Sequence, residues 1–258
     1  IEIVLKSIKI KNNKDNFYLT KKPKKIEFLK QRIELRNVFY KYKDNKKNTL
    51  ENINLIINKG ERIGIIGETG CGKSTLLDIL MGLLEPTSGE LLIDNKIISK
   101  KNKLLLKFWR QSISHVPQNI YLQDISFKEN IAFGSNLEKI NKSSIINAAK
   151  IADIHNLITS TENGYDSKIG EGGSKFSGGQ VQRVAIARAL YKNTEIIFLD
   201  EATSALDKKT EKKILDRIMQ LYDEITIVII THRLSTLSHC DRIYKVENRK
   251  IKSIEKLK

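Results

Sequence analysis

Long apolar runs, cysteines and acidic residues are all scarce in this chain of 258 residues. No stretch approaches the roughly 18 to 20 apolar residues that a membrane-spanning helix needs, and no secretory signal pattern is evident. The two cysteines, Cys71 and Cys240, are too few for a disulfide framework, so we expect a reducing, cytosolic setting. With 40% hydrophobic and 29% charged residues, the composition is typical of a soluble globular domain.

The shortage of acids leaves a formal net charge of +16. Such an excess can attract an anionic partner, such as nucleic acid, lipid headgroups or nucleotide. A compositional explanation competes with it, because Lys, Asn and Ile are abundant throughout, as an AT-rich genome would produce. The excess is not gathered into one basic helix, so we favour the compositional explanation.

The start of the chain differs from the rest. Residues 1–31 are rich in lysine and contain the polar strings KNNKDN and KKPKK, which predicts a linker. An edge strand and loop of the following domain is the alternative. Because the first residue is Ile1 and not Met, we expect a fragment of a longer protein. Residues 32–258 are predicted to form one domain.

Within that domain, apolar patterns of two periods alternate along the chain. Period-2 or short apolar patterns predict strands at 33–42, 52–60, 61–66, 195–200 and 226–232. Helical periodicity predicts helices at 73–84, ended by Pro86 and Gly89, at 143–158 with a serine N-cap, at 180–191 and at about 208–222. Strands that alternate with helices predict an α/β fold with a parallel sheet.

A glycine-rich string, GETGCGKST, joins the strand at 61–66 to the helix at 73–84. From Gly67 to Ser74 it matches the phosphate-binding loop G-x-x-x-x-G-K-[ST]. The glycines let main-chain N–H groups turn toward phosphate oxygens, and the helix adds its positive N-terminal end. Lys73 would reach the β- and γ-phosphates, and the Ser74 hydroxyl would reach Mg²⁺. A plain glycine-rich turn is the weaker alternative.

Two further strands end in polar residues. Asp200 closes an apolar strand, where a carboxylate can hold Mg²⁺ through water, and Glu201 can polarise the attacking water as a general base. His232 ends the next strand and could contact the γ-phosphate. Adjacent acids are usually a solvated turn and a lone histidine is usually structural, but the upstream phosphate-binding loop favours the catalytic interpretation.

A second phosphate-binding string, FSGGQ, precedes the helix at 180–191. The Ser177 hydroxyl and the N–H groups of Gly178 and Gly179 lie at a helix N-terminus, which favours an anion. Alone, such a string could equally be an ordinary helix cap. One molecule cannot use both strings on the same ATP, which predicts an ATPase that works when two copies meet.

With these motifs in this order, residues 33–252 resemble the nucleotide-binding domain of ABC transporters. FSGGQ resembles the family's signature, with Phe176 in place of the usual leucine, and Gln118 in HVPQ resembles the glutamine that reaches Mg²⁺ and senses the transmembrane partner. SALD at 204–207 resembles the D-loop, whose Asp207 faces the opposite subunit. Tyr42 resembles the ring that stacks on adenine, although Tyr40 and Phe39 are close alternatives.

The resemblance implies a fold, a ligand set and a mechanism. The fold is a P-loop ATPase core with a mostly parallel sheet, an antiparallel β subdomain and an inserted α-helical subdomain at about 99–190. The cofactors are ATP and Mg²⁺, with Ser74, Gln118 and Asp200 near the metal and Glu201, His232, Lys73 and Gln118 in catalysis. The implied ATP contacts are Tyr42, Gly67, Glu68, Thr69, Gly70, Cys71, Gly72, Lys73, Ser74 and Thr75, with Ser177, Gly178, Gly179, Gln180 and Asp207 of a second copy.

Two strings narrow the resemblance to exporters. KIGEGGSKFSGGQ resembles the exporter loop in which Glu171 touches the membrane domain, and DISFKENIAFG is also exporter-like. The resemblance implies a homodimer at the cytoplasmic face of the cell membrane, with a transmembrane domain on the same full-length chain. The strings GERIGIIGETGCGKST and HVPQNIYL are similar to the corresponding sequences of bacterial lipid-linked oligosaccharide flippases, which suggests a lipid-linked saccharide as the substrate.

Two other functions compete. A soluble ABC ATPase acting on nucleic acid or ribosomes would explain the positive charge, but the long coiled-coil insertions or tandem ATPase domains of such proteins do not occur here. No nucleic-acid partner is therefore expected. A non-catalytic interaction domain is disfavoured because Lys73 and Glu201 are both intact.

Overall fold

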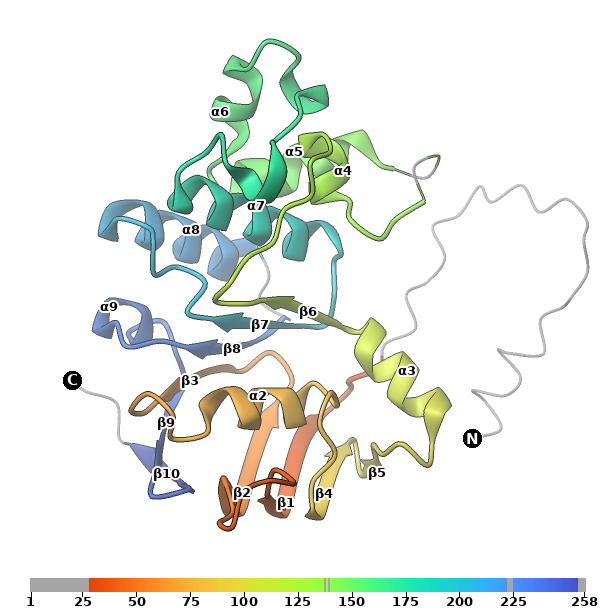
Figure 1. The fold of residues 1–258 in the computed structure, drawn as a ribbon, viewed down its shortest axis with the longest axis vertical. Coiled ribbons are helices and arrows are strands. Elements are labelled where there is room, and N and C mark those ends of the chain that lie inside the picture. Colours follow the sequence, from red (N-terminus) through yellow and green to blue (C-terminus); the bar gives the residue numbers. More distant parts are fainter. Residues whose placement is uncertain (1–27, 137, 139, 222–224, 255–258) are drawn as a thin grey trace, which may run out of the picture.

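The protein is described by a computed structural model that covers residues 28–136, 138, 140–221 and 225–254. Its strands form two sheets (Figure 1). A four-stranded antiparallel sheet has the order β2-β1-β4-β5, and a six-stranded sheet has the order β10-β9-β3-β8-β7-β6, parallel except for β10. This confirms the predicted α/β class with a mostly parallel sheet and a separate antiparallel sheet.

Five of the ten strands that the structure describes were predicted, and their bounds agree with the prediction to within a few residues: β1 Arg32–Tyr40, β2 Leu50–Asn58, β3 Arg62–Ile66, β7 Ile196–Asp200 and β8 Thr226–Ile230. The strands that were not predicted are β4 Ser88–Ile93, β5 Lys96–Ile97, β6 Ile113–Val116, β9 Arg242–Glu247 and β10 Lys250–Ile254. The range predicted for the helical subdomain, about 99–190, also contains β6, which belongs to the parallel sheet.

Helices cover both faces of the parallel sheet (Figure 1). Their bounds are α2 Lys73–Leu80, α3 Lys103–Gln111, α4 Phe127–Ile131, α5 Lys142–Ile151, α6 His155–Ser160, α7 Gly178–Tyr191, α8 Lys208–Leu221 and α9 Leu234–Leu237. Figure 1 shows α7 and α8 on one face of the sheet and α2 on the other, on the side of the antiparallel sheet. None of these described helices is long and apolar enough to span a bilayer.

The strand β7 shows how the two faces separate two apolar cores. Ile197 and Leu199 are buried in the core beneath α7 and α8, whereas Ile196 and Phe198 are buried in the core around α2 and the antiparallel sheet. Because successive side chains of a strand point to opposite faces, a strand covered on both faces is apolar throughout. This explains why β7 is a continuous apolar run that ends at Asp200.

The single helix predicted at 143–158 is wrong, because the chain forms two helices there. The N-cap of α5 is Asn141, whose side chain accepts the N–H of Ser144, and not a serine. The helix stops before Asp153, which has a left-handed φ of 56°. Its carboxylate accepts Lys213 at 2.7 Å and Arg217 at 3.1 Å, both from α8. The break itself is a local Schellman C-cap, in which the N–H of Ile154 donates to the carbonyl of Ala149 at 2.9 Å and the N–H of Asp153 to that of Lys150 at 3.2 Å.

The helix predicted at 73–84 ends earlier, at Leu80. Gly82 has a φ of +68°, and the N–H of Leu83 donates to the carbonyl of Asp78 at 2.8 Å, as in a Schellman C-cap. A Cβ at Gly82 would lie 2.8 Å from Leu106 on α3. The glycine therefore ends the helix four residues before Pro86, which the sequence pattern identified as the stop.

Residues 28–31, which the sequence assigned to the linker, contact the folded domain. The N–H groups of Phe28 and Leu29 donate to the carboxylate of Glu195 at 3.0 and 2.6 Å, and Leu29 is fully buried. The Asp94 carboxylate accepts the next three main-chain N–H groups at 2.7 to 2.9 Å. The rest of the predicted linker, 1–27, lies outside the described residues.

Candidate nucleotide-binding site

The phosphate-binding loop lies between β3 and α2, as the sequence predicts. Gly67, Gly70 and Gly72 have φ values of +153°, +79° and +108°, which side chains rarely adopt. A Cβ at Gly67 would also lie 2.5 Å from the carbonyl oxygen of Val246. Gly72 is the N-cap of α2 and supplies no side-chain hydrogen bond to the helix. The first N–H groups of α2 are therefore left for an anion.

Lys73 places a charge inside this loop. The residue is only 8% exposed, and its Nζ donates to the carbonyls of Gly67 at 2.7 Å and Glu68 at 2.8 Å. Within the part of the chain that the structure describes, Lys73 forms no ion pair. A buried ammonium group held by neutral carbonyls is stabilised by an anion. The loop therefore fits a phosphate group.

A pocket of about 520 Å³ lies over the loop, which is a suitable size for a small ligand. Its lining residues come from widely separated parts of the chain. They are Tyr42, Asn45, Thr49, Thr69, Gly70, Gly72, Lys73, Ser74, Thr75, Gln118, Asp200, Glu201 and His232. Asn45 and Thr49 were not predicted; they lie between β1 and β2, close in sequence to Tyr42, and that proximity is the signal that could have identified them.

Glu201 is held between two other predicted residues. Its Oε2 accepts the side-chain Nε2 of Gln118 at 2.8 Å, and its Oε1 lies 3.2 Å from the Nε2 of His232. Its N–H donates to the carbonyl of Ile230 on β8 at 3.0 Å, and its φ is 48°. A left-handed non-glycine residue at the end of a strand costs energy and often marks a functional position. Here the turn aims the carboxylate into the pocket, and Gln118 contacts it directly.

Asp200 lines the same pocket and has an unusual charge environment. Burial raises the pKa of this carboxyl, the nearby Glu201 charge raises it further, and Lys73 opposes both effects. Among the described residues no three His, Cys, Asp or Glu side chains gather as a metal cluster. Magnesium ions commonly use one or two carboxylates together with substrate phosphates, so Asp200 with the Ser74 hydroxyl fits Mg²⁺.

Of the three aromatic candidates for adenine contact, Tyr42 lines the pocket and Tyr40 and Phe39 do not. The Tyr42 hydroxyl lies 3.1 Å from Thr75 Oγ1, and the ring stands edge-on to Tyr40 with the centroids 4.9 Å apart. At 40% exposure the ring keeps a free face. This geometry favours Tyr42 over Tyr40 and Phe39 as the ring that contacts adenine.

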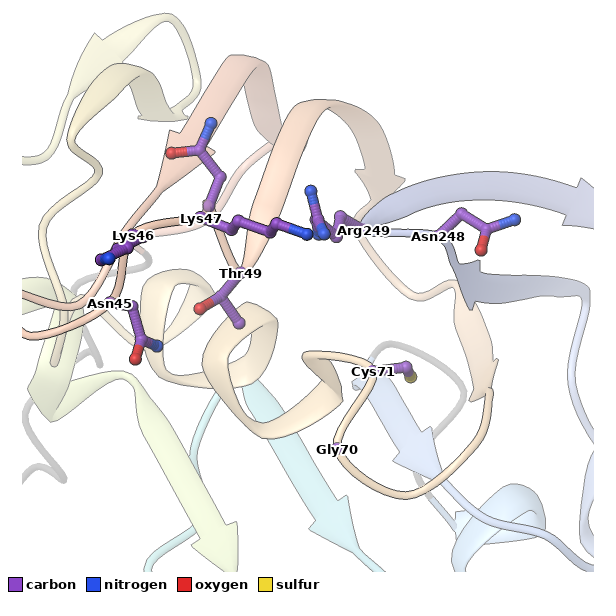
Figure 2. Close-up of a pocket in the computed structure, with 9 residues that line it drawn as sticks. Asn45, Lys46, Lys47, Thr49, Gly70, Cys71, Asn248 and Arg249 are labelled. Carbon is purple, nitrogen blue, oxygen red and sulfur yellow. The ribbon is translucent and has the colours of Figure 1, made fainter.

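Cys71 belongs to the other side of the loop. It lines a neighbouring pocket of about 500 Å³, together with residues 45–49 and Asn248 and Arg249 (Figure 2). Figure 2 shows Lys46, Lys47 and Arg249 around this opening, which gives it a positive character, although Arg249 is paired with Glu51 at 3.0 Å. Cys71 therefore belongs to the phosphate-binding loop but does not line the pocket that contains Asp200 and Glu201.

The second predicted string lies elsewhere. Ser177 is the N-cap of α7: its side chain accepts the N–H of Gln180, whose side chain in turn accepts the N–H of Ser177. These two residues, with Gly178 and Gly179, do not line the nucleotide pocket. In Figure 1, α2, which follows the phosphate-binding loop, lies on one face of the parallel sheet, and α7, which follows FSGGQ, lies on the other. One chain does not bring the two strings together.

Asp207 and Glu171 also lie outside the pocket lining. Asp207 is exposed at the start of α8, where its Oδ1 accepts the N–H groups of Thr210 at 2.9 Å and Lys209 at 3.1 Å. The hydrogen bond from Thr210 is the main cause of the lowered pKa of this carboxyl. Glu171 is exposed and begins the short 3₁₀ helix Glu171–Gly173, just before the signature.

Comparisons with known proteins agree with this geometry. The sequence profile of the ABC transporter family matches residues 50–204. A putative multidrug export ATP-binding/permease protein of Bacillus subtilis, YgaD, is 39% identical over 216 residues, covering 84% of this chain and 36% of the relative. A protein of the same description from Staphylococcus aureus (strain NCTC 8325 / PS 47) is 40% identical over 223 residues, covering 86% and 38%.

Among solved structures, a bacterial Atm1-family ABC exporter with ATP bound matches with a TM-score of 0.81 and 34% identity, covering 88% of this chain and 39% of that chain. The protein therefore belongs to the ABC transporter family, and the matched region is the ATP-binding part of these relatives. The chain spans less than two-fifths of the length of each of these three proteins. The alternative of a soluble ABC ATPase acting on nucleic acid is not favoured by these relatives.

Proposed function

We propose that the chain is the ATP-driven motor of a homodimeric ABC exporter, in which two copies enclose two ATP molecules head to tail. The observation that carries this proposal is the division of the site. Lys73, Asp200, Glu201 and His232 lie around one pocket, whereas Ser177 begins a helix on the opposite face of the sheet. Each copy then offers one open half-site and one separate anion-binding helix start, and a second copy completes both.

In this proposal the residues of the pocket have distinct roles in phosphoryl transfer. Lys73 and the loop N–H groups bind the phosphates, and Ser74 and Asp200 hold Mg²⁺, which when bound neutralises phosphate charge. Glu201 accepts a proton from the water whose oxygen bonds to the γ-phosphorus, while the bond to the bridging oxygen breaks and ADP leaves. His232 and Gln118 orient this carboxylate, as their contacts of 3.2 and 2.8 Å indicate.

The remaining parts of the proposal concern the whole transporter. The relatives carry the description ATP-binding/permease, which supports a transmembrane partner on the same full-length chain. This domain would then lie at the cytoplasmic face of the membrane. Glu171, exposed just before the signature, would contact that partner. The cargo is a compound exported or flipped across the membrane, with a lipid-linked saccharide as our candidate, and the choice of cargo would lie with the transmembrane part.

The proposal is tested with Glu201→Gln, which keeps the shape of the side chain and removes the base. We expect turnover to fall by about 100-fold or more, while ATP and Mg²⁺ convert the variant from monomer to dimer in size-exclusion chromatography. Glu162→Gln, at an exposed residue outside the pocket, is the matched control and should keep wild-type turnover. Normal turnover in Glu201→Gln, or a variant that stays monomeric with ATP, would contradict the proposal.

A further inference from the structure

The loop between β7 and α8 is held by the residue that follows the pocket histidine. The last four residues of this loop, 204–207, are called the SALD loop below. Arg233 is adjacent to His232 in the sequence, and its Nη1 donates to the Leu206 carbonyl at 2.9 Å while its Nη2 donates to the Ser204 carbonyl at 2.7 Å. A guanidinium group can make both contacts at once because its donors are fixed in a plane. The main chain of the SALD loop is thus fixed relative to the segment that carries His232.

A buried carboxylate on α8 fixes this arginine in turn. Glu211 is only 1% exposed, and its Oε2 accepts Arg233 Nη1 at 2.9 Å. Its Oε1 accepts the hydroxyls of Thr203 and Thr236, each at 2.6 Å. Burial acts to raise the pKa of Glu211, but these hydrogen bonds and the Arg233 charge outweigh it and lower the pKa overall. Glu211 thus links Arg233 to Thr203, which precedes the SALD loop, and to Thr236 on α9.

The opposite side of the SALD loop is tied to the signature helix. Gln182 on α7 donates its Nε2 to the Ser204 hydroxyl at 3.1 Å, and its Oε1 accepts the N–H of Ala205 at 2.9 Å. A Cβ at Gly179 would lie 3.0 Å from the Ala205 carbonyl oxygen, so the absence of a side chain there lets the loop approach the start of α7 closely. The SALD loop is therefore clamped between the signature helix and the His232 segment.

We propose that Glu211 and Arg233 are positioning residues that join His232 to the SALD loop, so that the two ATP sites served by one chain change together. The inference rests on the proposed head-to-tail dimer, in which His232 acts on the chain's own ATP and Asp207 and Ser177 act on the ATP of the partner. Neither Glu211 nor Arg233 lines the nucleotide pocket. Their effect is therefore on turnover and on communication between sites, and not on nucleotide binding by one chain.

The first test separates positioning from binding with Arg233→Lys, which keeps the charge next to Glu211 but loses the paired contacts to the loop carbonyls. We expect the Kd for ATP, measured on the monomeric chain, to stay within about twofold, and kcat to fall about tenfold. Arg36→Lys, which removes a guanidinium contact to Glu34 on the antiparallel sheet, is the matched control and should change neither quantity. An unchanged kcat in Arg233→Lys would overturn the proposal.

The second test asks whether the effect crosses to the partner's site. Mixed dimers are formed from wild-type chain and a differently tagged chain carrying Glu201→Gln, with or without Arg233→Lys. The remaining active site uses the wild-type Lys73, Glu201 and His232 but the SALD loop of the tagged chain. We expect Arg233→Lys in the tagged chain to lower turnover at that site about fivefold. Equal turnover in the two mixed dimers would show that the pair does not connect the sites.

These outcomes are distinguishable from failure of the dimer itself. If the Glu201→Gln chain alone forms no ATP-dependent dimer, the proposed function fails before the positioning role is reached. If Arg233→Lys lowers the Tm by more than a few degrees, Glu211→Gln replaces it, because the amide oxygen still accepts the Thr203 and Thr236 hydroxyls. The same fall in kcat with an unchanged Kd is expected, and an unchanged kcat overturns the proposal.

Discussion

Two glycine-containing helix N-termini in this molecule, those of α2 and α7, differ in how their main-chain N–H groups are capped. At α2 the N-cap is Gly72 in a left-handed conformation, with no side-chain cap and with the buried Lys73 next to it. At α7 the N-cap Ser177 and Gln180 satisfy each other's main-chain N–H groups in a capping box. The first leaves its N-terminal N–H groups without side-chain partners, whereas in the second two main-chain N–H groups already have side-chain partners before any ligand binds.

This difference indicates a division of labour between the two ends. An uncapped N-terminus with a lysine and two carboxylates can bind a nucleotide by itself, because donors, counter-charge and metal ligands surround one pocket. A preformed, capped N-terminus contributes a helix dipole and a serine hydroxyl, which are weak alone and useful against a nucleotide that is already held. The predictions below perturb one end at a time.

The largest effect is expected from alkylation of Cys71 in the phosphate-binding loop. The Cys71 sulfur packs against the loop, because a Cβ on Gly67 would lie only 2.7 Å from it, so we expect a bulky group on this thiol to distort the loop. We expect N-ethylmaleimide to weaken ATP binding at least about 100-fold by isothermal titration, and bound ATP to protect the thiol. Treated Cys71→Ser should bind ATP normally, because the other cysteine, Cys240, is fully buried. Full ATP binding by alkylated protein would refute this loop geometry.

An intermediate effect is expected from Ser177→Ala at the other helix start. Loss of the cap should lower the free energy of unfolding by about 1 kcal/mol, and turnover should fall roughly tenfold, while one chain binds ATP as before. Asn141→Ala, which removes the side-chain cap of α5, is the control and should lose similar stability without the loss of turnover. If Ser177→Ala weakens ATP binding by the isolated monomer, the two ends are not independent.

The sequence predicted those parts of the fold that depend on local periodicity. The apolar run of β7 and the helices α7 and α8 are long, uniform patterns, and the structure confirms them. The break at Asp153 was missed because the left-handed C-cap residue is an aspartate and not a glycine, so the apolar pattern continues through it. The contact of Phe28 and Leu29 with Glu195 was missed for a different reason, because the partners lie 167 and 166 residues apart in the sequence. Contacts of such long range leave no trace in a periodic pattern.

For the site, motif spacing predicted the residues whose role is set by one short string. Thr69, Gly70 and the residues from Gly72 to Ser74 line one pocket with Asp200 and Glu201, whereas Gly67, Glu68 and Cys71 do not line it. The contact of Gln118 with Glu201 was not foreseen, since the motif suggested a magnesium contact. The pair of Glu211 and Arg233 was also missed, although an arginine next to a motif histidine is a usable signal. Positioning residues act through other side chains, so their sequence context alone does not identify them.

The smallest effect is expected on the Tm of the ligand-free chain, when the charge of Asp200 in the nucleotide pocket is removed. Burial and Glu201 raise the pKa of Asp200, so ionisation of this carboxyl is less favourable in the folded chain than in the unfolded chain and lowers stability above the raised pKa. Without nucleotide or Mg²⁺, Asp200→Asn should therefore raise the Tm at pH 7 by about 2 °C, although turnover is lost. The gain should shrink as the pH falls through the raised pKa, because the wild-type carboxyl then becomes neutral as well.

The same measurement at Asp94 should have the opposite sign. Asp94 accepts three main-chain N–H groups where residues 30–32 enter the domain, so Asp94→Asn removes acceptor strength and should lower the Tm. A fall in Tm for Asp200→Asn would mean that its charge is already compensated in the free chain. The start of α2 would then need no ligand to balance its charges. In that case the difference between the starts of α2 and α7 would not explain why a single chain binds nucleotide at α2.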